Sequence, residues 1–265
     1  VFLPTYFENG GQYNLSLSVY IQVLPTLILG KSIWVTRGVS AAFSLLVPLF
    51  MGLILKTIFK NPYWWLAPMI AMTIPAWFLH SRTAFETVLM TGFYAGFLYF
   101  YLHYRQDHPK SLTPALIFGT LAFYAYSPGQ VIMVLTGALL LIADARYHWR
   151  HRRTALTGLG VLFMAALPYF RFLFTQQGAT RQHLTQLNTY WVKPHPLWQK
   201  IGMYFSRYLQ GFNPFYWFWP NPSLIERIWP EITLPTWLFA NQRDLARHTM
   251  KGYGHMLPLT FPLWA

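Results

Sequence analysis

The sequence has no cysteine and very little charge. It contains 265 residues, of which 10% are charged, whereas about 25% are charged in soluble domains. The lack of cysteine excludes disulfides and thiolate chemistry. The shortage of charge argues against a soluble domain, and 54% of the residues are hydrophobic and 19% aromatic. We therefore predict an all-α, polytopic membrane protein, because a helix satisfies its own backbone hydrogen bonds in lipid.

Several common motifs are also missing from the sequence. It contains no P-loop, no dinucleotide-binding glycine pattern, no His-Glu-x-x-His and no Gly-x-Ser-x-Gly. The nine histidines show no ligand spacing, so we assign no metal-binding residues. The chain has no signal pattern, does not begin with Met and stops in the apolar run LPLTFPLWA. We therefore expect an internal fragment that is truncated at both ends.

What the chain does have is a series of apolar segments that approach the length of a membrane-spanning helix, about 20 residues. We predict six spans, at residues 33–55, 63–79, 84–102, 112–126, 131–143 and 155–174. The spans divide the chain into four parts. Residues 1–32 are the end of a first external loop with interfacial helices, and residues 33–174 are the six-span bundle. Residues 175–254 are a long external aromatic-rich loop, and residues 255–265 are the start of a further span.

The net charge of +13 is distributed unevenly among the connecting loops. Eight basic residues lie in alternate loops, namely Lys56, Lys60, Arg105, Lys110, Arg146, Arg150, Arg152 and Arg153. The opposite loops contain only Arg82. Short loops rich in Lys and Arg stay in the cytoplasm. This pattern predicts a multi-pass protein of the plasma (inner) membrane that contacts anionic lipid rather than nucleic acid, with residues 1–32 and 175–254 outside.

The seven acidic residues differ in their surroundings. We expect Asp107 and Asp144 to be solvated loop charges, because both fall beside basic residues at cytoplasmic span ends. Glu86 lies one turn into the third predicted span, where a carboxylate needs a partner or a polar cavity. Arg82 precedes it by four residues. The two residues therefore form either an ion pair at the helix end or part of a polar cavity floor.

Arg37, near the outer start of the first predicted span, also has two interpretations. It is either an anchor that reaches the membrane interface or an inward-facing arginine that holds a phosphate. Glu8, His80, Arg82 and Glu86 are predicted to lie on the same external side as Arg37. This convergence of polar groups is our hypothesis for a functional site.

The order of these segments resembles a known family. The stretch TYFENGGQYNLSLSVYIQVLPTLILGKSIWVTRGVSAAFSLL is similar to the first external loop and following span of GT-C membrane glycosyltransferases. HSRTAFETVL and FYAYSPGQV resemble the two later external turns, and YFSRYLQGFNPFYWF resembles the long external loop. The specific resemblance is to the dolichyl-phosphate-mannose mannosyltransferase/ArnT-like group, glycosyltransferase family 39.

The resemblance implies an enzyme that transfers a sugar from a polyprenyl-phosphate donor to a protein, lipid or glycan acceptor. It implies roles for Glu8 as acceptor-orienting or base-assisting group, for Arg37 and Arg82 at the donor phosphate, and for Tyr6, His80 and Glu86 in support of the cavity. The family's main catalytic acid would precede Val1, and the sequence has Asn9-Gly10-Gly11 where the family often has Lys-Pro-Pro. The cofactor stays open, with a divalent metal as one option.

Two alternatives stay open from the sequence. An O-antigen ligase or polymerase also has many spans and a long external loop, and its essential Arg and His would be confined to residues 175–251. A transporter would have inverted repeats and ionisable groups near the membrane midplane. We see neither feature in the sequence, where most mid-span positions are uncharged.

Overall fold

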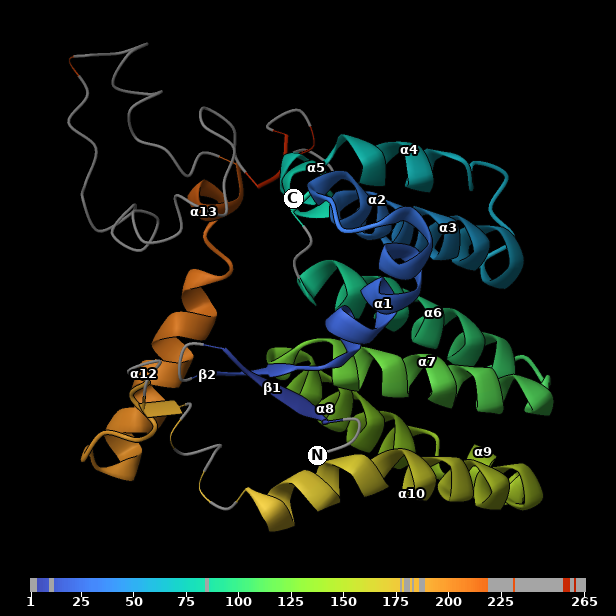
Figure 1. Ribbon diagram of the computed structural model, residues 1–265. Coiled ribbons are helices and arrows are strands. Elements are labelled where there is room, and N and C mark those ends of the chain that lie inside the picture. Colours follow the sequence, from blue (N-terminus) through green and yellow to red (C-terminus); the bar gives the residue numbers. More distant parts are fainter. Residues whose placement is uncertain are drawn as a thin grey trace. The chain divides into compact units, whose positions relative to one another are not determined.

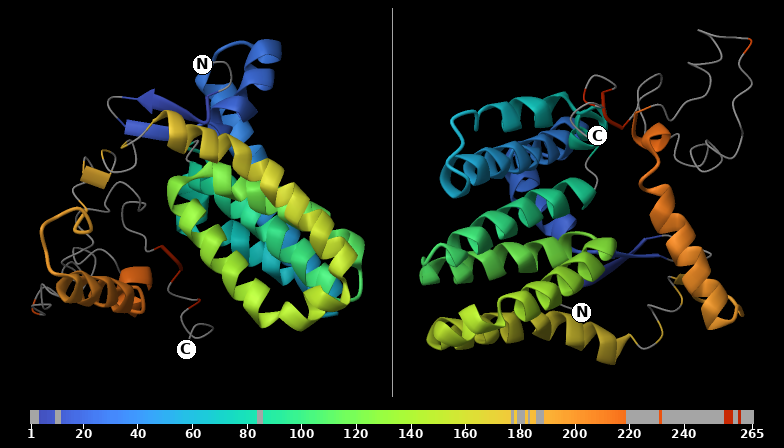
Figure 2. Two further views of the ribbon diagram at one scale, coloured as in Figure 1. Left: turned by 90° about the horizontal axis from the view of Figure 1, so that it is seen from below. Right: turned by 180° about the vertical axis from the view of Figure 1, so that it is seen from behind.

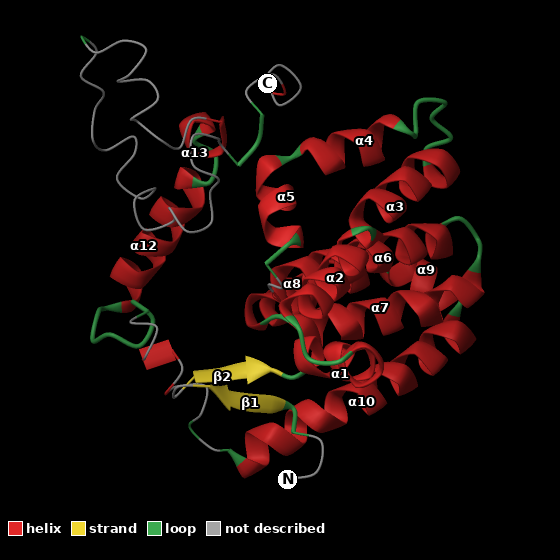
Figure 3. Cartoon of the chain, turned by 45° about the horizontal axis from the view of Figure 1, so that its top comes forward, coloured by secondary structure: helices red, strands yellow, loops and turns green. Residues whose placement is uncertain are grey.

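The computed structural model describes most of the chain up to residue 218. The described residues are 4–9, 12–83, 86–176, 178, 182, 184–185, 189–218, 231, 255–257 and 260. The chain divides into two compact units, of which the first comprises Val1–Met69 and Ser81–Gln186 and the second Ile70–His80 and Leu187–Ala265. The fold is mostly helical, as predicted (Figure 3).

The first unit begins with two strands and continues with helices. The strands are β1 (Tyr6–Asn9) and β2 (Gln12–Leu15). The strands are followed by α1 (Leu17–Leu29), α2 (Ile33–Ser44), α3 (Leu46–Leu53), the π-helix Ile54–Ile58 and α4 (Leu66–Thr73). The last residues of α4, from Ile70 on, belong to the second unit. The later helices are α6 (Glu86–Arg105), the 3-10 turn Pro109–Ser111, α7 (Leu112–Ala125), α8 (Ser127–Ala143), α9 (Ala145–Arg150) and α10 (Arg152–Thr175).

Helix α6 lies at the centre of the first unit. It packs against α2 and α3 on one side and along α7 on the other, and α7 in turn packs against α8 and α10 (Figures 1 and 2). Short connections make α6, α7, α8 and α10 alternate in direction. The starts of α6 and α8 and the end of α10 therefore lie at one end of the bundle.

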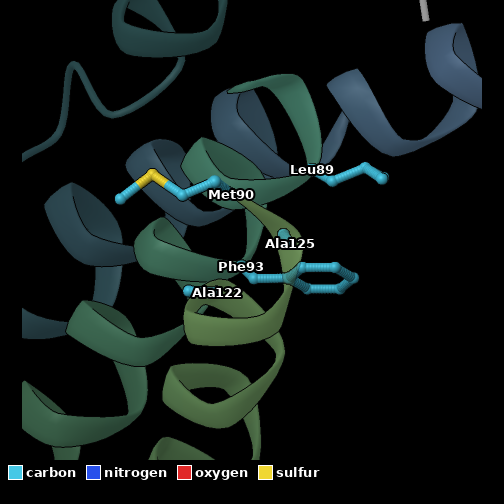
Figure 4. Close-up of a cluster of buried hydrophobic side chains, with 5 residues drawn as sticks. All are labelled: Leu89, Met90, Phe93, Ala122 and Ala125. Carbon is cyan, nitrogen blue, oxygen red and sulfur yellow. The ribbon is translucent and has the colours of Figure 1, made fainter. Parts of the chain in front are cut away.

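A core of large and small side chains joins α6 to α7. Figure 4 shows Leu89, Met90 and Phe93 of α6 beside Ala122 and Ala125 of α7. The alanines let the two helix backbones approach closely, which is how membrane helices gain packing contacts. Leucine and isoleucine side chains of α1 cover the same core, so the chain's opening segment is held on the bundle.

The helices agree closely with the six predicted spans. Each predicted span overlaps a helix or a pair of helices. Among the described residues, Ile33–Ile58 and Arg152–Thr175 are the two segments long and apolar enough to cross a membrane by length and composition. The other four spans stay predictions. The second one is interrupted, because α4 ends before Pro75, whose ring nitrogen has no N–H to continue the helical hydrogen bonds.

The structure adds a hairpin to one predicted segment and differs at two predicted connections. The opening segment was expected to contain interfacial helices, and it contains α1, which follows an antiparallel hairpin of β1 and β2 in which Tyr6 pairs with Leu15. SPGQ was expected to be a connecting turn, but it forms the start of α8, because proline is well tolerated in the first turn of a helix. The basic segment RYHWRHRR was expected to be a loop, but it is helical in α9 and at the start of α10.

The second unit contains α5 (Pro75–Ser81, whose last residue belongs to the first unit), α12 (Leu197–Gln210) and α13 (Pro214–Phe218). The amide of Ala76 donates to the carbonyl of His255, and the amide of Met256 donates to the carbonyl of Trp217. Helix α12 was predicted as an amphipathic stretch. Its exposed apolar residues are Leu197, Trp198, Ile201, Tyr204, Phe205, Tyr208 and Leu209. This spacing places them on one face, as in helices that lie at a membrane surface.

Candidate functional site

The hairpin is fixed to the start of α8 and the end of α10 through Tyr6. The Tyr6 hydroxyl donates to Gln130 Oε1 at 3.1 Å and accepts from Gln130 Nε2 at 2.8 Å. Its ring stacks on Phe172 of α10, with 4.0 Å between ring centroids. Burial raises the pKa of Tyr6 to about 12, so the phenol stays neutral and serves as both donor and acceptor at physiological pH. Tyr6 therefore anchors the predicted external segment to the bundle.

A second anchor lies where α10 contains Pro168. A proline inside a helix removes one backbone donor and disturbs the neighbouring hydrogen bonds. The Tyr124 hydroxyl donates to the carbonyl of Ala165 at 2.6 Å and accepts from the amide of Tyr169 at 3.2 Å. It thereby bridges two backbone groups that would otherwise bond to each other within α10. Thr5 bonds to the same part of α10, because its hydroxyl donates to the carbonyl of Pro168 at 3.0 Å.

Glu86 begins α6 at the same end of the bundle. Its side chain is half-buried, and its Oε1 accepts a hydrogen bond from the Ser18 hydroxyl of α1 at 3.4 Å. Glu86 therefore joins α1 to α6 beside the predicted external site.

The remaining predicted site residues are spread over both units. Arg37 is exposed in the second turn of α2, and Arg82 is exposed in the turn that precedes α6. His80 lies in α5 of the second unit. The backbone of Glu8 pairs with Tyr13 in the hairpin, while its side chain lies outside what the structure describes. The roles of these four residues, and those of Tyr6 and Glu86, stay predictions.

A separate polar cluster lies at the opposite end of the bundle, which was predicted to be cytoplasmic. Asp144 Oδ1 lies 3.0 Å from Arg105 Nε, and Asp144 Oδ2 accepts a hydrogen bond from the Tyr101 hydroxyl at 2.6 Å. The Asp144 side chain is only 15% exposed, so the prediction of a solvated loop charge is wrong. The physical reason is that α6 ends beside the junction of α8 and α9. The same prediction is confirmed for Asp107, whose side chain is 74% exposed.

His148 extends this cluster. Its Nδ1 lies 3.1 Å from the Tyr104 hydroxyl, and its Nε2 lies 3.3 Å from the Tyr101 hydroxyl. Burial lowers the pKa of His148 below its usual value, although the nearby Asp144 carboxylate opposes this shift. The ring is therefore neutral at physiological pH, and it accepts from one tyrosine while its other nitrogen carries a proton.

Sequence reasoning missed the partners of the predicted residues. Ser18, Tyr124 and Gln130 lie in apolar or turn segments and belong to no known catalytic motif. The proline inside α10 was the one local signal, because a kinked helix needs partners for its freed backbone groups. In the part of the chain that the structure describes, no group of three or more His, Cys, Asp or Glu side chains is placed to hold a metal ion.

A sequence model of a protein family matches residues 17–170, which is more than half of the chain. The description of this family is dolichyl-phosphate-mannose-protein mannosyltransferase. The matched range begins at α1 and ends inside α10, so it covers most of the first unit's helices. It confirms the family resemblance over this range and favours the glycosyltransferase interpretation over the ligase and the transporter.

Short local similarities to other proteins also exist. NADH-ubiquinone oxidoreductase chain 4 of Squalus acanthias is 41% identical over 63 residues, and that of Scyliorhinus canicula is 40% identical over 63 residues. Each match covers 24% of this chain and only 14% of the relative. No solved structure matches the chain. Similarity over so small a part of those relatives carries no conclusion about the reaction.

Proposed function

Because the chain belongs to the dolichyl-phosphate-mannose-protein mannosyltransferase family, and so to the membrane glycosyltransferases, we propose that it transfers a sugar from a polyprenyl-phosphate donor at the external face of the plasma membrane. Mannose and a protein hydroxyl are the donor sugar and acceptor that the family description suggests, and a lipid or glycan is an alternative acceptor.

One observation supports this site above the others. The opening segment is held against the bundle at three points, through Thr5, Tyr6 and Ser18. All three bonds reach the end of the bundle where α6 and α8 begin and α10 ends. A polar segment fixed at the outer end of apolar helices suits a donor whose phosphate meets water while its tail stays in lipid.

The reaction makes two chemical demands on such a site. The acceptor oxygen forms a bond to the anomeric carbon of the sugar, the bond between that carbon and the phosphate oxygen breaks, and the acceptor proton passes to a base. We assign Glu8 to the acceptor side, where a carboxylate orients the hydroxyl or assists the base. We assign Arg37 and Arg82 to the leaving phosphate, where their cationic charge stabilises the developing negative charge.

The other predicted residues have supporting roles in this proposal. Glu86 is a positioning residue, because its bond to Ser18 ties α1 to the turn that carries Arg82. Tyr6 keeps the hairpin in place through Gln130, and we assign His80 to the cavity wall. The apolar helices of the bundle hold the polyprenyl tail.

Substitution of the charged residues tests this assignment. In purified full-length protein supplied with polyprenyl-phosphate mannose, we expect Arg82→Ala and Glu8→Gln each to lower kcat/KM roughly 100-fold, as loss of one charge-stabilising group does in other enzymes. Transfer of labelled sugar is the measurement, and an unchanged melting temperature shows that the variants are folded.

Lys31→Gln is the matched control, because Lys31 is exposed just before α2 but has no proposed role. We expect its kcat/KM to stay within about twofold of the unmodified protein, as for most surface substitutions. Unchanged transfer in both Arg82→Ala and Glu8→Gln would remove the assignment of these residues.

A further inference from the structure

An apolar groove lies between α7, α8 and α10 in the first unit, with α6 at its base. Its volume is about 460 Å³. Most of its lining is aliphatic or aromatic, including Leu116, Phe123, Met133 and Leu162. The polar side chains of the lining are Thr120 and Tyr124 toward the outer end, and Tyr101 and His148 at the other end.

Small residues create this groove. Gly137 and Ala138 line it from α8, and Ala155 and Gly158 line it from α10. A Cβ atom added at Gly137 would meet nothing within 4 Å, so the space beside this residue is open. The apolar rim is exposed as well, because Val134, Leu141 and Leu159 are 60%, 58% and 57% accessible. A groove of this kind opens toward lipid rather than toward another helix of the unit.

The length of the groove matches one leaflet of a bilayer. Along α10 its lining runs from Ala155 to Ala166, which is about 17 Å at 1.5 Å per residue. Half of a hydrocarbon core is about 15 Å thick. One acyl chain of one leaflet therefore has the length that the groove accommodates.

The two ends of the groove differ in chemistry. At the outer end, the Tyr124 hydroxyl is already bonded to backbone groups of Ala165 and Tyr169. At the other end, His148 lies within a basic segment whose exposed arginines are Arg146, Arg150, Arg152 and Arg153. Two acidic residues lie in this region. Asp144 is already paired with Arg105, and Asp107 Oδ1 lies 3.7 Å from His151 Nε2. Trp149 is 77% exposed in the same segment, as tryptophans at a membrane–water interface often are.

We propose that this groove binds one acyl chain of an anionic phospholipid, whose phosphate lies against the basic segment Arg146–Arg153. The charge of the basic segment is complementary to the headgroup, and basic pockets between membrane helices bind such lipids. The site lies at the opposite end of the bundle from Glu86, and the lipid comes from the leaflet that the loop charges predict to be cytoplasmic. The site is therefore independent of the proposed sugar transfer.

Native mass spectrometry of the full chain in neutral detergent tests the proposal, with phosphatidylglycerol as the probe. We expect one phosphatidylglycerol to be retained, and phosphatidylcholine with the same acyl chains to be lost. Gly137→Leu fills the groove and should abolish retention. Leucine is also more favourable than glycine in a helix, and the site has room for the added atoms, so this variant should fold.

Two further variants separate the parts of the site. Gly160→Leu is the matched control, because Gly160 lies on α10 with open space around it but outside the groove lining, and it should bind like the unmodified protein. Replacement of both Arg150 and Arg153 by Gln should weaken phosphatidylglycerol binding roughly 30-fold. This factor assumes that each of the two arginines contributes as much as one basic residue usually does near an anionic lipid surface.

Three results would overturn the proposal. The first is equal retention of phosphatidylglycerol by Gly137→Leu and Gly160→Leu, and the second is equal retention of phosphatidylcholine and phosphatidylglycerol. The third is displacement of bound phosphatidylglycerol from the unmodified protein by an equal concentration of polyprenyl phosphate, which would assign the groove to the tail of the sugar donor. Loss of sugar transfer in Arg82→Ala leaves all three measurements unaffected, so the two proposals fail separately.

Discussion

At the scale of single residues, two aspartates with similar sequence surroundings have different environments. Asp107 and Asp144 both follow an apolar segment and precede basic residues. Asp107 has a backbone φ of 61°, which directs it into a turn, and its side chain stays in solvent. Asp144 lies at the junction of α8 and α9, where Arg105 and Tyr101 of α6 reach it. Asp107 Oδ1 does accept a hydrogen bond from the Tyr147 hydroxyl at 3.4 Å and lies 3.7 Å from His151 Nε2, but its side chain is 74% exposed. The difference arises because α6 covers Asp144, whereas Asp107 stays at the surface.

This contrast predicts unequal effects of the same substitution. Asp144→Asn removes the charge that balances Arg105, and it should lower the free energy of unfolding by about 1.5–3 kcal/mol, as for hydrogen bonds to charged groups. Asp107→Asn is the matched control, and Asn tolerates a positive φ, so its effect should be under about 1 kcal/mol. Thermal unfolding in detergent measures both variants, and equal melting temperatures would contradict the structural role of Asp144.

At the scale of elements, the bundle depends on the close approach of α6 and α7. Gly96 of α6 lies directly against the ring of Phe118 of α7, and a Cβ atom at this position would overlap that ring. The ring has little freedom to move away, because Phe50 and Phe100 lie against it with centroid distances of 5.2 Å and 5.4 Å. A small residue at position 96 is therefore required by packing between helices.

We predict that Gly96→Ala destabilises the protein although alanine is the better helix former. Overpacking of a filled core lowers the free energy of unfolding by about 1–3 kcal/mol, whereas the better helix propensity of alanine raises it by about 1 kcal/mol. The two effects cancel at the lower limit, and otherwise overpacking is the larger. Gly160→Ala is the control, because nothing lies within 4 Å of its added Cβ. A melting temperature of Gly96→Ala above that of Gly160→Ala would show that the helices are not packed as described.

At the scale of the whole molecule, the chain combines a helical membrane fold with an uneven charge distribution. Lys31 and Lys110 are both exposed, and they belong to loops that the positive-inside rule places on opposite sides of the membrane. The external location of the proposed site depends on this orientation. The lack of cysteine makes the orientation easy to test, because any introduced thiol is unique.

We expect opposite labelling of two single-cysteine variants in intact cells. Lys31→Cys should react with a membrane-impermeant maleimide from outside, whereas Lys110→Cys should react only after permeabilisation. The unmodified chain, which has no thiol, is the control for background labelling. Reaction of Lys110→Cys alone in intact cells would reverse the orientation and move the proposed transfer site to the cytoplasmic face.

The sequence by itself determined the membrane class, the positions of most helices and the family. These features are local, because apolar length and loop charge act on each segment separately. The tertiary structure alone decided that Tyr124 bridges the backbone of α10, that Ser18 bonds to Glu86 and that Asp144 pairs with Arg105. Their partners lie about 40 or more positions away in the chain, so these contacts form only when the helices pack, and a pattern read along one segment does not contain them.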